Sequence, residues 1–396
     1  MKSAEAFAHR TDSLAPEGAY QVLARAQALE AAGRDIIHFE IGQPDFETFE
    51  NIREAGRQAI ADGFTRYTPP VGMPALRAAI AAHAGAQRGL RFEPEQVVVS
   101  PGAKPNLFFT ALALIEPGDE VMYPDPGFPT YRAMIEVAGG IPVPVPLEEE
   151  SDFSLDMKTF DRLVNPRTRM IVLNSPGNPT GGVIPAADLE HIAAAATKQD
   201  CWVLSDEIYA GLVYDGGTAS SIAALPGMQD RTIIVDGFSK TYAMTGWRLG
   251  YGIMPVALAQ KMDLLLTHSV GSTAHFTQIA GIEALTGPQE HAAGMVEEYQ
   301  RRRDMMVAGL RSIPGVSCRT PAGAFYAFPN IKALGRPSAE ITDLLLNEAG
   351  VAVLPGSSFG QHGEGYLRLS YATSRDLITT GVERMRESLG RLSART

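Results

Sequence analysis

Cysteine, net positive charge and long apolar runs are all scarce in this chain, and each shortage excludes a class of protein. Among 396 residues there are two cysteines, Cys201 and Cys318, far apart and in no CxxC spacing. So few cysteines suit a reducing compartment and give no framework for a metal. No segment approaches the roughly 20 apolar residues that span a membrane, and the amino terminus lacks an apolar signal core. We therefore expect a cytoplasmic protein that binds no metal and does not enter a membrane.

Acidic residues outnumber basic ones, which bears on the partners that the chain can have. The 45 Asp and Glu residues against 34 Lys and Arg residues leave a formal net charge of -11 at pH 7. A chain of this charge repels nucleic acids and anionic membranes, so we expect neither as a partner. A few well-placed arginines outweigh the global field locally, and an anionic small-molecule substrate is compatible with this composition.

Short apolar runs alternate with helical patterns through the middle of the chain. Such runs are typical of strands buried on both faces of a sheet. Strands are predicted at 96–100, 120–123, 170–174, 202–205 and 232–235, and helices at 50–61, 74–86, 104–115, 128–138, 186–198 and 254–267. This alternation predicts an open α/β fold with a mostly parallel sheet flanked by helices, in which ligands lie outside the carboxyl ends of the strands.

The pattern changes past residue 286, where longer helices and shorter strands indicate a second, smaller α+β domain. Its predicted elements are helices at 288–311, 338–349 and 375–390 and strands at 316–319, 324–328, 351–354 and 366–371. The amino-terminal segment, with a helix at 18–33 and a strand at 35–41, is expected to join it. We therefore predict a large domain over residues 45–287 and a small domain made of residues 1–44 and 288–396.

The stretch DGFSKTYAMTGWRLGY, residues 236–251, follows a predicted strand and contains Lys240 and Arg248. A lysine amine attacks carbonyl carbon when its surroundings lower its pKa. The planar fork of an arginine suits a phosphate. Together the two residues indicate a carbonyl-bearing phosphate cofactor, namely pyridoxal phosphate. A surface lysine and a surface arginine that merely flank a loop would give the same pattern.

A glycine turn, SPGAKP over residues 100–105, feeds the start of a predicted helix. The first backbone N–H groups of a helix have no partner within it and carry a partial positive charge, so this turn suits a phosphate. Many ordinary strand–helix turns also contain glycine.

Other polar side chains follow the strands in the same way, each with a structural alternative. Asn178, in NSPGNPTG, can donate to a phenolate oxygen or simply stiffen a turn. Asp206 can hold a pyridinium nitrogen in its protonated form or cap the following turn. Phe128 can stack on a flat ring or pack in the core. Arg368, amid apolar residues, needs an anionic partner, which is either an acid of the fold or a carboxylate substrate.

The order of these motifs resembles that of one family over nearly the whole chain. The matching segments are IGQPDF, RYTPPVGMPALR, SPGAKPNLF, PDPGFPTY, NSPGNPTG, SDEIYAGLVY, FSKTYAMTGWRLGY and YLRLSYA. They resemble the class I/II aminotransferases of the aspartate aminotransferase superfamily, which are fold-type I pyridoxal-phosphate enzymes. The resemblance implies a sheet of the seven-stranded type, pyridoxal 5'-phosphate as cofactor and a homodimer with shared active sites.

The resemblance also implies roles for single residues. Lys240 would bond to the cofactor and carry the α-proton, and Asp206 would keep the ring nitrogen protonated. Tyr209 and Asn178 would hold the phenolic oxygen, and Phe128 would stack on the ring. The residues implied for the phosphate are the backbone of Ala103 and Lys104, with Ser239, Arg248 and, from the neighbouring subunit, Tyr67. Those implied for the substrate α-carboxylate are Arg368, Asn178 and the backbone of Gly42. One departure is Gly237, where some members have a phosphate-binding serine.

These implications predict an aminotransferase that works by a ping-pong cycle, with 2-oxoglutarate as a suitable acceptor. In animal-type aspartate aminotransferases a partner arginine binds the distal carboxylate, yet residues 262–300 contain neither Lys nor Arg. Bacterial-type relatives use a lysine in the phosphate turn, where Lys104 lies, so an aspartate-like donor is favoured. Alanine or an aromatic amino acid is the alternative, because Ala19 and Tyr20 near the entrance are apolar.

Two other functions use related folds. A pyridoxal-phosphate lyase that eliminates from Cβ would keep the same lysine and ring contacts, and it would release pyruvate and ammonia without an oxo acid. A cofactor-sensing regulator would need an added DNA-binding segment. The chain has neither the extra length nor a basic helix-turn-helix, which argues against a regulator.

Overall fold

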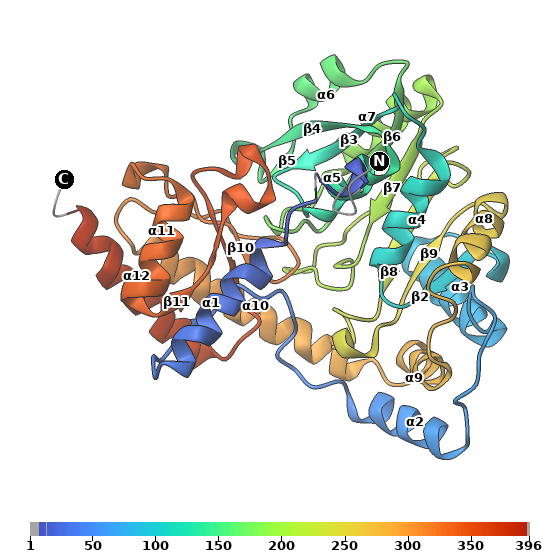
Figure 1. The fold of residues 1–396 in the computed structure, drawn as a ribbon, viewed down its shortest axis with the longest axis horizontal. Helices are drawn as coiled ribbons and strands as arrows, with labels where there is room; N and C mark the ends of the chain where they lie inside the picture. The colour runs from blue at the N-terminus through green and yellow to red at the C-terminus, as the bar shows by residue number, and fades with distance from the viewer. Residues whose placement is uncertain (1–7, 13, 394–396) are drawn as a thin grey trace, which may run out of the picture.

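A computed structural model describes residues 8–12 and 14–393 of the chain. Figure 1 shows a twisted sheet with helices around it, and beside it a second group of elements formed by the carboxyl-terminal part of the chain. Helix α1 (Gly18–Ala31) contacts the strands of this second group, although it lies at the other end of the sequence.

The large sheet has eight strands in the order β2-β9-β8-β7-β6-β3-β4-β5, one more than the seven-stranded type that the resemblance implies, because the two-residue β5 pairs with the end of β4 at one edge. Their bounds are β2 (Val97–Ser100), β3 (Glu120–Asp125), β4 (Ile141–Glu148), β5 (Ser154–Leu155), β6 (Thr168–Asn174), β7 (Trp202–Asp206), β8 (Thr232–Gly237) and β9 (Gly250–Ile253). Strand β9 runs antiparallel to both neighbours and the two-residue β5 antiparallel to β4, while the other pairs are parallel. The prediction of an α/β fold with a mostly parallel sheet is therefore confirmed.

Three of these strands, β4, β5 and β9, are absent from the sequence prediction. Strand β4 contains Pro142, Pro144 and Pro146, which lack the N–H that a strand needs. The backbone N–H of Ile141 donates to Asp119 on the β3 side, so the prolines alternate toward the outer edge. There only the end of β4, at Leu147 and Glu148, pairs with the short β5. Strand β9 has no strand pattern in the sequence because two of its four residues are glycines.

Eight helices surround the large sheet in the described ranges. They are α2 (Glu50–Ala61), α3 (Pro74–Arg88), α4 (Lys104–Leu114), α5 (Thr130–Ala138), α6 (Met157–Leu163), α7 (Ala186–Gln199), α8 (Val256–Thr267) and α9 (His275–Thr286). Helices α6 and α9 were not predicted. Helix α9 packs against both α2 and α3, and burial on more than one side removes the polar stripe by which a surface helix is recognised.

The second group of elements contains two small sheets. One has the order β10 (Tyr326–Ala327), β13 (Leu367–Ser370), β12 (Leu354–Pro355), and in the other β1 (Ile37–His38) pairs with β11 (Val351–Ala352). Helices α10 (Glu290–Arg311), α11 (Ser338–Leu344) and α12 (Arg375–Ser393) pack around them, and residues Leu345–Ala349 form a π-helix. The strand predicted at 316–319 was wrong, since only an isolated bridge joins Ser317 to Asn330.

The predicted division into domains at 44/45 and 287/288 stays a prediction. Its small domain includes residues 1–7, 13 and 394–396, which lie outside the described residues. The apolar core falls into several clusters, of which the largest surrounds the small sheets and contains Phe325, Tyr326 and Leu367. In the part of the chain that the structure describes, no helix combines the length and the apolar character needed to cross a membrane.

Candidate active site

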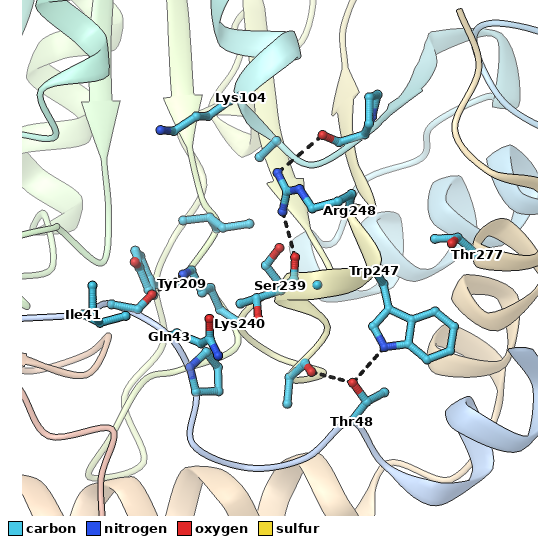
Figure 2. A pocket seen from close by; sticks show the side chains of 18 of the residues that line it. Ile41, Gln43, Thr48, Lys104, Tyr209, Ser239, Lys240, Trp247, Arg248 and Thr277 are labelled. Atoms are coloured by element: carbon cyan, nitrogen blue, oxygen red, sulfur yellow. Dashed lines mark hydrogen bonds between the residues drawn. The ribbon is translucent and has the colours of Figure 1, made fainter. Parts of the chain in front are cut away.

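A cavity of about 1530 Å³ lies outside the carboxyl ends of β6, β7 and β8. Asn174 ends β6, Asp206 ends β7, and Lys240 follows β8, so neighbouring parallel strands deliver these side chains to the same edge of the sheet. The wall includes eleven of the residues that the sequence predicted, namely Gly42, Ala103, Lys104, Phe128, Asn178, Asp206, Tyr209, Ser239, Lys240, Arg248 and Arg368. Figure 2 shows several of them around the cavity, with Lys240 and Tyr209 near its middle.

Lys240 extends into this cavity from the segment after β8. Its Nζ donates a hydrogen bond of 2.6 Å to the backbone oxygen of Gly42. Burial lowers the pKa of the Lys240 amine to about 8, and the nearby positive charges of Arg368 and Arg248 act in the same direction. A lysine with this pKa has an appreciable fraction of free amine near neutral pH, as a nucleophile or a base needs.

Asp206 lies at the floor of the cavity with two donors directed at its carboxylate. The hydroxyl of Tyr131 donates to Oδ2 at 2.7 Å and the backbone N–H of Ile208 donates to Oδ1 at 3.2 Å. Burial raises the pKa of Asp206 to about 6, while these two hydrogen bonds oppose the rise because they favour the carboxylate. Near neutral pH the side chain is therefore mostly ionised.

The turn before α4 packs closely against Arg248. The Ser100 hydroxyl donates to the Gly102 oxygen at 2.6 Å and accepts from the Asn106 amide at 2.8 Å, which holds the turn in place. Gly102 has a φ of +85°, and a Cβ there would lie 2.1 Å from a terminal nitrogen of Arg248. The Arg248 guanidinium donates to the Thr245 oxygen at 2.9 Å and to the Pro101 oxygen at 3.4 Å, so it lies beside the turn that leads into α4 (Figure 2). The first backbone N–H groups of α4 start from this turn. This is a site suited to a phosphate.

Gly237, the departure noted in the sequence, ends β8 beside this turn. A Cβ there would lie 3.0 Å from the Cα of Gly250 and 3.2 Å from the Leu249 oxygen. Such contacts are tighter than most real Cβ contacts, so the absence of a side chain lets β8 and β9 approach each other.

Arg368, in β13, lines the same cavity. Its guanidinium donates to the backbone oxygen of Glu40 and, at 3.4 Å, to the side-chain oxygen of Asn178. Its Cζ lies over the Tyr326 ring, 4.6 Å from the ring centroid. Its Nε is buried and has no hydrogen-bond partner. A buried guanidinium with unused donors at a cavity wall can bind a carboxylate.

Tyr209 and Tyr326 contact each other in the wall of the cavity. Their hydroxyl groups lie 2.7 Å apart, and burial raises the pKa of Tyr209 well above its ordinary value. A Cβ on Gly42 would lie 2.1 Å from the Tyr326 hydroxyl, so the position opposite Lys240 requires glycine.

Lys104 lies at the rim of the cavity and is already paired. Its ammonium group contacts the carboxylate of Glu17, and their side chains are 44% and 29% exposed. The same ammonium lies 5.1 Å from the ring centroid of Phe128, which in turn meets Tyr131 edge to face. A positive charge is therefore available beside the cavity, but an anion that approaches it competes with Glu17.

Tyr67 is the one predicted site residue that does not line this cavity. Its side chain is 100% exposed, although the backbone around it is held firmly. The amide of the buried Gln278 donates to the Thr68 hydroxyl at 2.8 Å and accepts from the backbone N–H of Met73 at 2.8 Å. The loop thus presents an aromatic side chain outward.

Sequence reasoning missed several residues of the wall, among them Glu17, Tyr131, Asn174 and Tyr326. Asn174 had a signal, because it ends a predicted strand in the motif that contains Asn178. Its side chain donates to the backbone oxygen of Asp206 at 3.0 Å and accepts from the backbone N–H of Asn178 at 2.8 Å. Tyr131 and Tyr326 had none, since each reaches its partner from a distant part of the chain.

The chain is similar to known aminotransferases over most of its length. A family model described as aminotransferase class I and II matches residues 34–385. The chain is 39% identical over 371 residues to an aspartate aminotransferase of Pyrococcus horikoshii, with 93% of each chain covered. It is 38% identical over 387 residues to aromatic-amino-acid aminotransferase 2 of Thermococcus litoralis, covering 97% of this chain and 98% of the relative. A solved alanine aminotransferase from Pyrococcus furiosus matches with a TM-score of 0.93 at 31% identity, covering 98% of this chain and 100% of that one.

Proposed function

This chain belongs to the class I and II aminotransferases, and we propose that it uses pyridoxal 5'-phosphate to move the amino group of an aspartate-like L-amino acid to a 2-oxo acid such as 2-oxoglutarate. The observation that carries the proposal is one cavity in which the amine of Lys240, its pKa lowered by burial, faces Asp206 and the cations of Arg248, Arg368 and Lys104.

The donors around the cavity fit this cofactor by their chemistry. Arg248, Ser239 and the free N–H groups at the start of α4 would hold the phosphate. Asp206 would hold the ring nitrogen, and the Phe128 ring offers a flat apolar face. Tyr209 and Asn178 would donate to the phenolic oxygen. When bound, the cofactor supplies a carbonyl carbon for amines and a ring that withdraws electrons from the substrate Cα.

The protein's own groups would then bind the substrate and move its proton. Arg368 would hold the α-carboxylate through the nitrogen that lacks a partner, with Asn178 and the Gly42 backbone beside it. Lys240 would take the proton from the substrate Cα and return it, because an amine with a pKa of about 8 both accepts and donates near neutral pH. Asp206 would remain ionised and stabilise positive charge on the ring nitrogen.

The substrate side chain is the part on which the relatives differ. A distal carboxylate would pair with Lys104 at the rim after displacing Glu17. An aromatic donor is the second candidate, because Tyr20, Leu23 and Phe46 also line the cavity and a relative named for aromatic amino acids is 38% identical to this chain.

We also propose that the active form is a homodimer. Tyr67 is wholly exposed on a firmly held loop, and Ile60 and Val270, which line the outer part of the cavity, are 52% and 46% exposed. If a second copy of the chain covers these apolar side chains, Tyr67 of one copy would lie near the phosphate-binding residues of the other copy. A dimeric mass by sedimentation supports this arrangement, and full activity of an isolated monomer contradicts it.

A panel of amino donors tests the proposed function. Aspartate, alanine and phenylalanine are each supplied with 2-oxoglutarate, and the amino and oxo acid products are measured. Fastest turnover of aspartate supports the proposal, and fastest turnover of phenylalanine supports the aromatic reading. A donor with a leaving group on Cβ, such as cystathionine, is tested without any oxo acid acceptor, and release of pyruvate, ammonia and the thiol from it would identify a lyase instead.

A further inference from the structure

A buried ion-pair cluster lies next to the proposed site but lines no part of its cavity. Arg88, at the end of α3, donates from Nε to Glu207 Oε2 at 2.7 Å and from Nη2 to Asp236 Oδ2 at 3.0 Å. The side chains of Arg88, Glu207 and Asp236 are only 4%, 6% and 10% exposed. We call these three residues the Arg88 cluster.

Every carboxylate oxygen of the Arg88 cluster has a partner. Glu207 Oε1 accepts from the hydroxyls of Ser205 at 2.8 Å and Ser221 at 2.6 Å. Asp236 Oδ1 accepts from the backbone N–H of Gly237 at 2.7 Å, and Oδ2 accepts from the Tyr251 hydroxyl at 3.1 Å. Breaking a buried pair of this kind leaves an uncompensated charge, which is far more costly than losing a surface pair.

The cluster joins the two strand ends on which the proposed chemistry depends. Glu207 directly follows Asp206 at the end of β7, and Asp236 lies near the end of β8, shortly before Lys240. The strands are also joined by the Glu207 N–H, which donates to the Val235 oxygen at 2.8 Å. Asp206 lines the cavity and Asp236 does not, so the Arg88 cluster contacts the strand ends on the side that faces away from the cavity.

We propose that Arg88 is a positioning residue for the active site, because its guanidinium ties the end of β7 that carries Asp206 to the end of β8 that leads to Lys240. This inference rests on the roles proposed for Asp206 and Lys240. A catalytic group displaced by about 1 Å can lose roughly 100-fold in rate, so a tie at this point has a measurable effect on turnover.

The test compares Arg88→Met with a matched control, Arg91→Met, in the protein saturated with pyridoxal phosphate. Arg91 lies three positions further along the chain, and its side chain is 88% exposed and forms a surface ion pair with Glu93. In Arg88→Met we expect faster hydrogen exchange confined to residues 205–208 and 235–241. We also expect kcat of the amino-donor half-reaction to fall about 100-fold, with KM changed by less than about threefold. The control should leave all three quantities unchanged.

Two results would overturn the inference. One is wild-type exchange and wild-type kcat in Arg88→Met, and the other is faster exchange spread evenly over the chain, which indicates general destabilisation. Hydrogen exchange reports on the strand ends whatever reaction the protein catalyses, so a failed transamination assay on the wild type would count against the proposed function alone.

Arg88→Lys serves if the methionine variant does not fold. A lysine reaches one carboxylate of the cluster but cannot bridge both as a guanidinium does. We expect faster exchange at one strand end and a loss of about tenfold in kcat. Wild-type values in this variant would contradict the proposed role of the two-armed contact.

Discussion

Replacing Lys104 by glutamine should slow dicarboxylic donors and spare the others. In the cavity rim the Lys104 ammonium pairs with Glu17, and both side chains are partly exposed. An ion pair of this exposure contributes about 0–1 kcal/mol. A charge-assisted hydrogen bond to a substrate carboxylate contributes about 1.5–3 kcal/mol. The substrate therefore displaces Glu17 with a net gain.

These magnitudes give opposite effects for the two partners. Lys104→Gln should lower kcat/KM for aspartate roughly two- to hundredfold, because the loss is the substrate hydrogen bond less the cost of displacing Glu17. Glu17→Gln removes the competitor and should raise kcat/KM for aspartate by up to about fivefold. Alanine and phenylalanine carry no distal carboxylate, so neither variant should change their values by more than about twofold.

The assay follows each amino-donor half-reaction separately, through the absorbance of the bound cofactor. The full reaction is unsuitable because 2-oxoglutarate is itself dicarboxylic and would suffer in its own half-reaction. An equal loss for all three donors in Lys104→Gln would refute the reasoning. Lys104 would then bind the cofactor phosphate or stabilise the fold, and alanine or an aromatic amino acid would become the favoured donor.

Three further predictions concern the floor of the cavity. Asp206→Ala should still bind pyridoxal phosphate through the phosphate group of the cofactor, but proton abstraction should be about 100-fold slower or more. Near-normal single-turnover rates in this variant would show that the carboxylate only caps the following turn. Tyr131→Phe removes a hydrogen-bond donor to the Asp206 carboxylate, so the pKa of Asp206 should rise. In a plot of the half-reaction rate against pH, the acid limb should then move to higher pH by about one unit. An acid limb that does not move would contradict this prediction. In protein freed of cofactor, Lys240 with a pKa of about 8 should carry free amine at pH 7 about 300-fold more often than an ordinary lysine. Its labelling by an amine reagent, measured by peptide mass, should level off above about pH 8, whereas a rate still rising at pH 10 would argue against the lowered pKa.

Much of the fold could be predicted because its central strands are easily recognised in the sequence as short apolar runs. Strands β2, β3 and β8 are buried along their whole length, so each reads as a short apolar run between turn residues. Parallel strands place their carboxyl ends at one edge of a sheet, which is why the sequence alone predicts that Asp206 and Lys240 lie near each other.

The parts that escaped prediction depend on contacts between distant segments. Both glycines of β9 leave room for the start of α4. A Cβ on Gly250 would lie 2.5 Å from the Ala103 nitrogen, and one on Gly252 would lie 2.9 Å from the Asn106 side-chain oxygen. The strand pattern is lost for that reason. Tyr131 reaches Asp206 at the end of β7 from helix α5, and Arg88 reaches Asp236 in β8 from helix α3. A sequence gives the residue types in order, but these pairings arise only when the helices are packed on the sheet.

Identification of the lysine that holds the cofactor tests the central claim most directly. The purified protein is incubated with pyridoxal phosphate, reduced with borohydride and digested, and the labelled peptide is found by mass spectrometry. The account predicts one label, on Lys240. In Lys240→Ala both this label and the transamination activity should be lost. A label on Lys104 or any other lysine, or turnover that survives in Lys240→Ala, would contradict the account.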